Sequence, residues 1–176
     1  MTLPAMHVVP LGICLGAAAV WDLAKRKIPN PLTAAVATLG VGVQWWNQGS
    51  LAALSGLAAG ALSIAVLYRA WLAGGIGGGD VKLAGAVAIW VGLAHLVAFA
   101  LVTALAGGVV AAICYASSGR SARREMNGNL IGAVLAQELP VIDRSALAAG
   151  TARVTVPYGV AVAAGGLLAL WAPWSS

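Results

Sequence analysis

The fold is decided by the stretch Leu83-Ala-Gly-Ala-Val-Ala-Ile-Trp-Val-Gly92-Leu-Ala-His95, which continues without a Lys, Arg, Asp or Glu as far as Ala116. A bilayer core of about 30 Å requires a helix of roughly 17 to 25 apolar residues. At about 1.5 Å of rise per residue, the stretch from Leu83 to Ala116 is too long for one such helix. We therefore expect two membrane-spanning helices here, separated near Gly92 and His95.

The composition extends this conclusion to the whole chain. Of its 176 residues, 61% are hydrophobic and 9% are charged, and a soluble domain of this size could not cover that apolar content with polar surface. We predict an all-α fold, a polytopic membrane helix bundle that forms a single domain over residues 1–176. About six transmembrane helices are expected, at about residues 4–21, 31–46, 51–72, 82–94, 96–116 and 154–173.

The basic residues predict the orientation of the bundle. If the loop after the first span lies inside the cell, all ten Lys and Arg residues fall on the cytoplasmic side, as the positive-inside rule describes. Trp45 and Trp46 then belong to an outer aromatic belt, and Trp21 and Trp71 to an inner one. Residues from about 117 to 153 form a cytoplasmic loop, in which 130–139 has the apolar spacing of a helix on the membrane surface.

Two aspartates stand at the inner edges of predicted spans. A carboxylate at the edge of a span is costly to desolvate and is a functional-site hypothesis by default. The alternative is that Asp22 and Asp80 only pair with neighbouring basic residues at helix ends. A run of glycines before Asp80 favours a site, because glycine permits positive φ and close backbone approach. The two segments read Val20-Trp-Asp22-Leu-Ala-Lys-Arg-Lys-Ile-Pro29-Asn30 and Gly74-Gly-Ile-Gly-Gly-Gly-Asp80-Val-Lys82.

These two segments resemble the signature segments of the type IV prepilin peptidases, a branch of the Gly-x-Gly-Asp intramembrane aspartyl proteases. Gly77, Gly79 and Asp80 fill the Gly-x-Gly-Asp pattern, and Asp22 stands where the family carries its other catalytic aspartate. The resemblance runs from about residue 10 to residue 116. It implies that Lys82, Pro29 and Asn30 belong to the motifs that position the substrate. A weaker resemblance, to the entrance of the family's C-terminal helix, is seen in Pro157-Tyr158-Gly159.

The resemblance also implies a substrate and a place in the cell. The substrate is a prepilin with a basic leader and an apolar helix, cut at the cytoplasmic face of the bacterial inner membrane. The expected partners are the prepilin, the lipid bilayer and the pilus assembly machinery, with no nucleic acid and no cofactor. Larger members carry an N-terminal segment with paired cysteines that is associated with methylation. This sequence is similar to the short members of Flp/Tad-type systems, so we expect no methyltransferase activity.

The chemistry expected of the pair is that of an aspartic-type endopeptidase. Two carboxyl groups that lie close together share one proton, so one deprotonates water while the other protonates the scissile carbonyl. Helix ends favour an ionised Asp80, at the start of a helix, and a protonated Asp22, at the end of one. The basic cluster after Asp22 acts in the opposite direction.

Three other functions are compatible with parts of the sequence. The archaeal preflagellin peptidases share the same catalytic core. A serine intramembrane protease would use Ser55 and His95, although the first Gly of the Gly-x-Ser-Gly pattern is missing before Ser55. A transporter or assembly subunit would use its acids to bind cations or protons. No metal site is expected, because the His and Cys residues share no ligand spacing.

Overall fold

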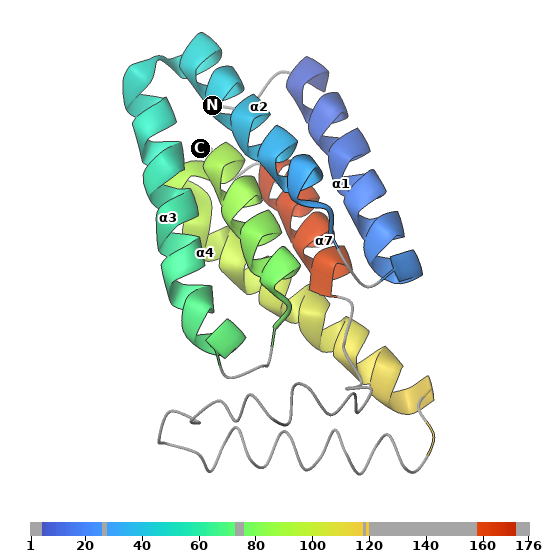
Figure 1. Cartoon of the computed structure of the whole chain (residues 1–176). Helices are drawn as coiled ribbons and strands as arrows, with labels where there is room; N and C mark the ends of the chain where they lie inside the picture. Colours follow the sequence, from blue (N-terminus) through green and yellow to red (C-terminus); the bar gives the residue numbers. More distant parts are fainter. Residues whose placement is uncertain (1–4, 26–27, 73–75, 118, 120–157, 172–176) are drawn as a thin grey trace.

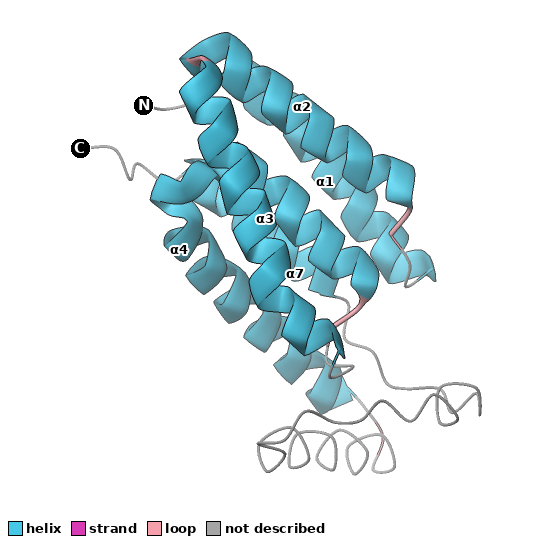
Figure 2. Ribbon diagram, turned by 60° about the vertical axis from the view of Figure 1, so that its left-hand side comes forward, coloured by secondary structure: helices cyan, strands magenta, loops and turns pink. Residues whose placement is uncertain are grey.

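The described part of the chain is built from helices. The computed structural model describes residues 5–25, 28–72, 76–117, 119 and 158–171. Within these ranges the chain forms helices and no strand, which confirms the all-α expectation. The helices pack side by side in one bundle (Figure 1 and Figure 2). They are α1 (Ala5–Lys25), α2 (Asn30–Gln48), α3 (Ser50–Leu72), α4 (Gly78–Ser117) and α7 (Tyr158–Trp171).

The longest helix, α4, is interrupted at Gly92. Its φ of 71° and ψ of 172° are not helical, and glycine adopts them far more readily than any residue with a Cβ. The side-chain amide of Gln44 in α2 donates hydrogen bonds to the carbonyl oxygens of Ile89 and Trp90, both at 3.1 Å. Figure 1 shows the chain turning back here, rising along the green half of α4 and descending along the yellow half. The expected separation near Gly92 is confirmed.

The predicted ranges agree with the helices to within four residues, and the start of α4 is one of the places where they differ most. The span was predicted from residue 82, whereas α4 begins at Gly78, inside the glycine run. Asp80 therefore lies in the first turn of this helix. The predicted loop at 117–153 falls, beyond its first residues, outside the described residues, as does the whole of the predicted surface helix at 130–139.

The first half of α4 forms the centre of the bundle. From Val81 to Gly92 every residue is buried except Lys82, because α2, α3 and α7 all pack against this helix. Helices α3 and α4 approach very closely. A Cβ added to Gly56 would lie 2.6 Å from the carbonyl oxygen of Ile89, so the spacing of small residues in α3 serves close packing between helices.

Beyond Gly92, α4 presents an apolar face to the outside. Five side chains at intervals of four residues share this face and are exposed in the described part of the chain: Val97, Leu101, Leu105, Val109 and Ile113. Two described helices, α3 and α4, are long and apolar enough to cross a membrane. Shorter apolar stretches lie in the other helices, at Leu11–Asp22 and Tyr158–Ala169.

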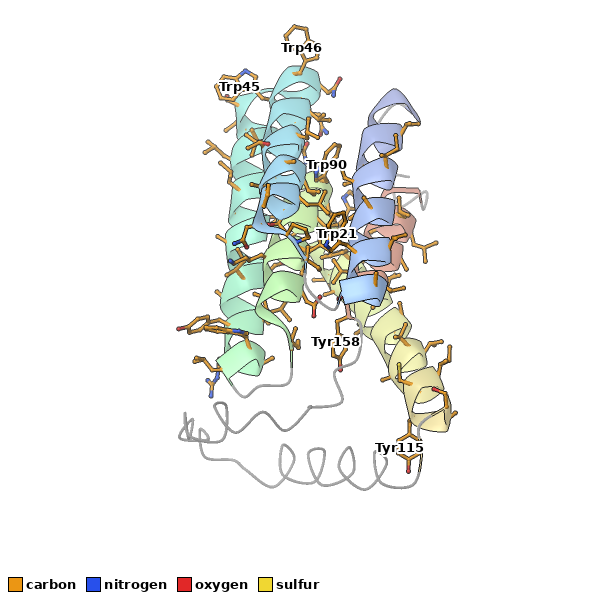
Figure 3. The ribbon with its side chains drawn as sticks, turned by 45° about the vertical axis from the view of Figure 1, so that its right-hand side comes forward. Trp21, Trp45, Trp46, Trp90, Tyr115 and Tyr158 are labelled. Carbon is orange, nitrogen blue, oxygen red and sulfur yellow. The ribbon has the colours of Figure 1, made fainter. Side chains whose placement is uncertain are left out.

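The two ends of the bundle differ in the side chains that they present. At one end α2 passes into α3 through Gly49, whose φ is 84°. Trp45 and Trp46 are exposed beside this turn. Figure 3 shows them at the opposite end of the molecule from Tyr115 and Tyr158.

Candidate active site

Asp22 lies in the last turn of α1, and its side chain is 5% exposed. Its Oδ2 atom accepts a hydrogen bond of 3.0 Å from the backbone N–H of Gly159. Gly159 is the second residue of α7, and the N–H groups in the first turn of a helix have no partner within the helix. The buried carboxyl group of Asp22 thus supplies an acceptor to the start of another helix.

Asp80 is held by the turn that starts its own helix. The carbonyl oxygen of Gly77 accepts the N–H groups of Asp80 and Val81, at 3.1 and 3.2 Å. In return, the Asp80 carboxyl group accepts the backbone N–H of Gly77. This reciprocal pair is the capping arrangement in which the third residue of a helix reaches back to the residue before the helix. It fixes a buried carboxyl group, 9% exposed, at the start of α4.

The two carboxyl groups belong to one site. The side chain of Ile28 lies between the segments that hold them: a Cβ on Gly79 would be 3.2 Å from Ile28 Cβ, and one on Gly159 3.1 Å from Ile28 Cδ1. The Asp22 and Asp80 carboxyl groups are close enough to interact electrostatically. The structure therefore brings these two predicted residues together at the end of the bundle where α1 ends and α4 and α7 begin (Figure 1).

The glycines of the run serve close approach rather than an unusual backbone conformation. Among the described glycines, only Gly49 and Gly92 have positive φ, so the expectation of positive φ in the run is wrong for Gly77 and Gly79. A Cβ on Gly77 would lie 2.9 Å from Oδ2 of Asp80. A Cβ at either position would press on the site, because the aspartate and Ile28 already occupy the space.

The remaining predicted residues join the two motif segments. The Nζ atom of Lys82 donates a hydrogen bond of 3.0 Å to Oδ1 of Asn30. Pro29 is the N-cap residue of α2, and its carbonyl oxygen accepts the N–H groups of Leu32 and Thr33. The segment after Asp22 is thereby tied to the N-terminal part of α4.

Two of the alternatives read from the sequence do not match the described contacts. Lys82 forms no ion pair with Asp80 in the part of the chain that the structure describes, since its ammonium group meets Asn30. Ser55 forms no hydrogen bond with His95 among the described residues, and its Oγ accepts the N–H of Leu93 at 3.2 Å. That bond stabilises the turn after Gly92, far along α4 from Asp80.

The reactive groups that the site presents are two carboxyl groups. Within residues 5–25, 28–72, 76–117 and 158–171, no three His, Cys, Asp or Glu side chains are grouped so as to hold a metal ion. Cys14 and Cys114 form no disulfide. The chemistry of the described site is therefore considered for the carboxyl groups of Asp22 and Asp80.

The contact of Asp22 with α7 was missed by the sequence reasoning. The sequence offered only the weak resemblance of Pro157-Tyr158-Gly159 to the entrance of the family's C-terminal helix, and this resemblance assigned no role to Gly159. The hydrogen bond joins residues 137 positions apart. No periodicity or local motif reports a contact over such a separation.

One protein-family model matches the part of the chain that holds most of this site. The model of the type IV leader peptidase family matches residues 10–112, which include both aspartates, the glycine run and Asn30. No curated protein and no solved structure matched the chain. The matched region covers more than half of the sequence, and the resemblance read from the two motif segments is confirmed. The chain belongs to the type IV leader peptidase family.

Proposed function

We propose that this protein is a membrane-embedded aspartyl endopeptidase that removes the leader of type IV prepilins, of the Flp/Tad type, at the cytoplasmic face of the bacterial inner membrane. The observation that carries the proposal is the convergence of Asp22 and Asp80, two buried carboxyl groups from different helices. Burying one carboxyl group beside another is costly. Such a cost is expected where the pair performs chemistry.

The reaction needs only the two side chains and water. One carboxylate accepts a proton from a water molecule, whose oxygen attacks the scissile carbonyl carbon. The other carboxyl group gives its proton to the carbonyl oxygen, and a tetrahedral diol forms without a bond to the enzyme. One carboxyl group then gives its proton to the peptide nitrogen while the other carboxylate takes a proton from a diol hydroxyl. The C–N bond breaks to leave a carboxylic acid and an amine, and one shared proton remains on the pair.

The first turn of α4 supports this chemistry through rigidity. The Asp80 carboxyl group accepts the N–H of Gly77, and the bond restricts its rotation. Correct placement of reacting groups lowers a reaction barrier by several kcal/mol. Because Gly77 and Gly79 carry no side chain, an extended peptide can approach the backbone there. We propose that the scissile segment of the prepilin lies along this turn.

The charges and the helix lengths support the proposed placement in the membrane. The interruption at Gly92 divides α4 into two helices, which supports a bundle of about six spans. The exposed face of Val97, Leu101 and Leu105 would contact lipid. With Lys and Arg on the cytoplasmic side, the aspartates lie where the basic leader of a prepilin meets its apolar helix.

Cleavage of a prepilin in proteoliposomes tests the proposal. The purified protein should shorten a prepilin with a basic leader, and Asp22→Asn and Asp80→Asn should each lower the rate at least about 1,000-fold, since a shared proton requires both groups. The third aspartate of the chain, Asp143, offers a matched control, and Asp143→Asn should keep wild-type activity. Cation or proton flux without cleavage would instead favour a transporter. Substantial activity in either aspartate variant would exclude the shared-proton mechanism.

A further inference from the structure

The start of α7 lies against the aspartate site, and we infer that Gly159 is a positioning residue whose backbone N–H orients the Asp22 carboxylate for peptide cleavage. The inference rests on the proposed function. Its direct support is the 3.0 Å hydrogen bond from Gly159 N to Asp22 Oδ2. Both residues are buried, and a hydrogen bond to a buried charged group is worth more than one at the surface.

The second observation is the absence of space at Gly159. A Cβ built on this residue would lie 2.7 Å from Oδ2 and 3.1 Å from Cγ of Asp22. A contact below 3.0 Å forces something to move, and Ile28 Cδ1, 3.1 Å away, closes another direction. Only glycine lets the backbone of α7 come this close to the carboxylate.

The two aspartates are therefore held by the same kind of bond, but the donors come from different parts of the chain. Each accepts a backbone N–H at the N-terminal end of a helix, from Gly77 for Asp80 and from Gly159 for Asp22. The bond to Asp80 is local and forms with α4 itself. The bond to Asp22 spans 137 positions, so it forms only when α7 is docked. Gly159 also lies outside the region 10–112 that matches the family.

The docking of α7 thus completes the site. The first N–H groups of a helix carry partial positive charge, and here they face the carboxylate that α1 carries at its C-terminal end. This bond restricts rotation of the Asp22 side chain about its Cα–Cβ and Cβ–Cγ bonds. A loss of orientation lowers the rate of the chemical step and leaves substrate binding unchanged.

The test compares Gly159→Ala with a matched glycine-to-alanine change in α4, at a residue that packs on the start of α7. Gly107 packs on Tyr158, and its added Cβ would meet ring atoms at 3.5 Å, an ordinary contact. Gly107→Ala therefore adds the same methyl group without touching Asp22. Steady-state cleavage of a prepilin in proteoliposomes gives kcat and KM. Infrared difference spectra of protein with ¹³C-labelled aspartate, referenced to Asp22→Asn, give the carboxyl stretching band of Asp22.

We expect Gly159→Ala to lower kcat at least about tenfold with KM within about threefold of wild type, and to shift the Asp22 band. Gly107→Ala should change neither quantity. The inference is overturned if Gly159→Ala keeps wild-type kcat, or if kcat falls while the Asp22 band stays in place, because the loss would then be merely structural. A wild-type protein that cleaves no prepilin would overturn the proposed function itself, and the band shift would still report whether the hydrogen bond holds Asp22.

Discussion

Lys82 donates a hydrogen bond of 3.0 Å from its ammonium group to the side-chain oxygen of Asn30, across 52 positions of sequence. The bond connects the second turn of α4, directly after the turn that carries Asp80, to the first residue of α2. Asn30 stands two residues after Ile28. The side chain of Ile28 lies between the segments that hold the two aspartates. The bond therefore fixes one motif segment against the other at the edge of the site.

Removing either partner of this bond should slow cleavage by a similar amount. We expect Asn30→Ala and Lys82→Met each to lower kcat/KM about fivefold, or about 1 kcal/mol, which is typical of one exposed hydrogen bond. The double variant should be no slower than either single variant. Asn47→Ala, which removes an exposed amide that bonds only to Val43 of its own helix, is the control. Multiplying effects in the double variant would show that the two residues act separately.

Side chains added within the glycine run should lower activity through contact. Gly77→Ala places a methyl group 2.9 Å from Oδ2 of Asp80, and Gly79→Val presses on Ile28. Initial rates of prepilin processing should fall at least about tenfold, or about 1.4 kcal/mol of barrier. Gly42→Ala on α2 meets no atom within 4 Å and should keep the wild-type rate. Equal rates in all three variants would mean that these glycines do not shape the site.

The interruption of α4 should contribute to stability rather than to chemistry. Gly92→Ala forces a residue with a Cβ into a φ of 71°, at about 1–3 kcal/mol. Gln44→Leu leaves the carbonyl oxygens of Ile89 and Trp90 without their donor, which costs about 1–3 kcal/mol. Thermal unfolding in detergent should show lower midpoints for both.

The same two variants should keep the kcat of the folded protein, because Gly92 lies about 18 Å along the helix from Asp80. Gly108→Ala, in a position with no atom within 4 Å, is the control and should be as stable as wild type or more so. Unchanged midpoints in Gly92→Ala and Gln44→Leu would show that the helix interruption is not held by these contacts.

The proposed orientation can be measured with single cysteines in a background that lacks Cys14 and Cys114. Ser50 and Ser117 are both exposed in the described structure. Ser50 precedes the predicted span 51–72 on its outer side, and Ser117 follows the predicted span 96–116 on its cytoplasmic side. A membrane-impermeant maleimide should label Ser50→Cys in intact cells and Ser117→Cys only after the inner membrane is opened. Labelling of Ser117→Cys from outside would reverse the topology and move the aspartates to the other face.

The helices and the break at Gly92 were predictable because both follow from lengths. The run from Leu83 to Ala116 exceeds the thickness of a bilayer, and only glycine readily turns a chain at positive φ. The start of α4 was not predictable at the same level. Glycine disfavours helix, yet here the reciprocal bonds between Gly77 and Asp80 stabilise the first turn. The helix therefore begins four residues earlier than its apolar content indicates.

The aspartate pair could be proposed from sequence because ionisable groups are scarce in an apolar chain. Which aspartate carries the proton could not be inferred in the same way. The expectation of a protonated Asp22 counted only the C-terminal end of α1. The structure adds the N-terminal end of α7 at the same carboxyl group, through Gly159. Two helix ends with opposite partial charges meet there, so helix polarity does not indicate which of Asp22 and Asp80 carries the proton.

The turn at Gly92 also divides α4 into halves that evolution can treat differently. From Val81 on, the first half is buried except at Lys82, and near Gly56 a single methyl group would collide with Ile89, so few substitutions are compatible with it. The second half keeps an outward face, from Val97 to Ile113, that needs only to be apolar. Exchange among Val, Leu, Ile and Phe on that face is nearly neutral. Mutational drift in this lineage should therefore accumulate after residue 92 and remain rare in the fourteen positions before it.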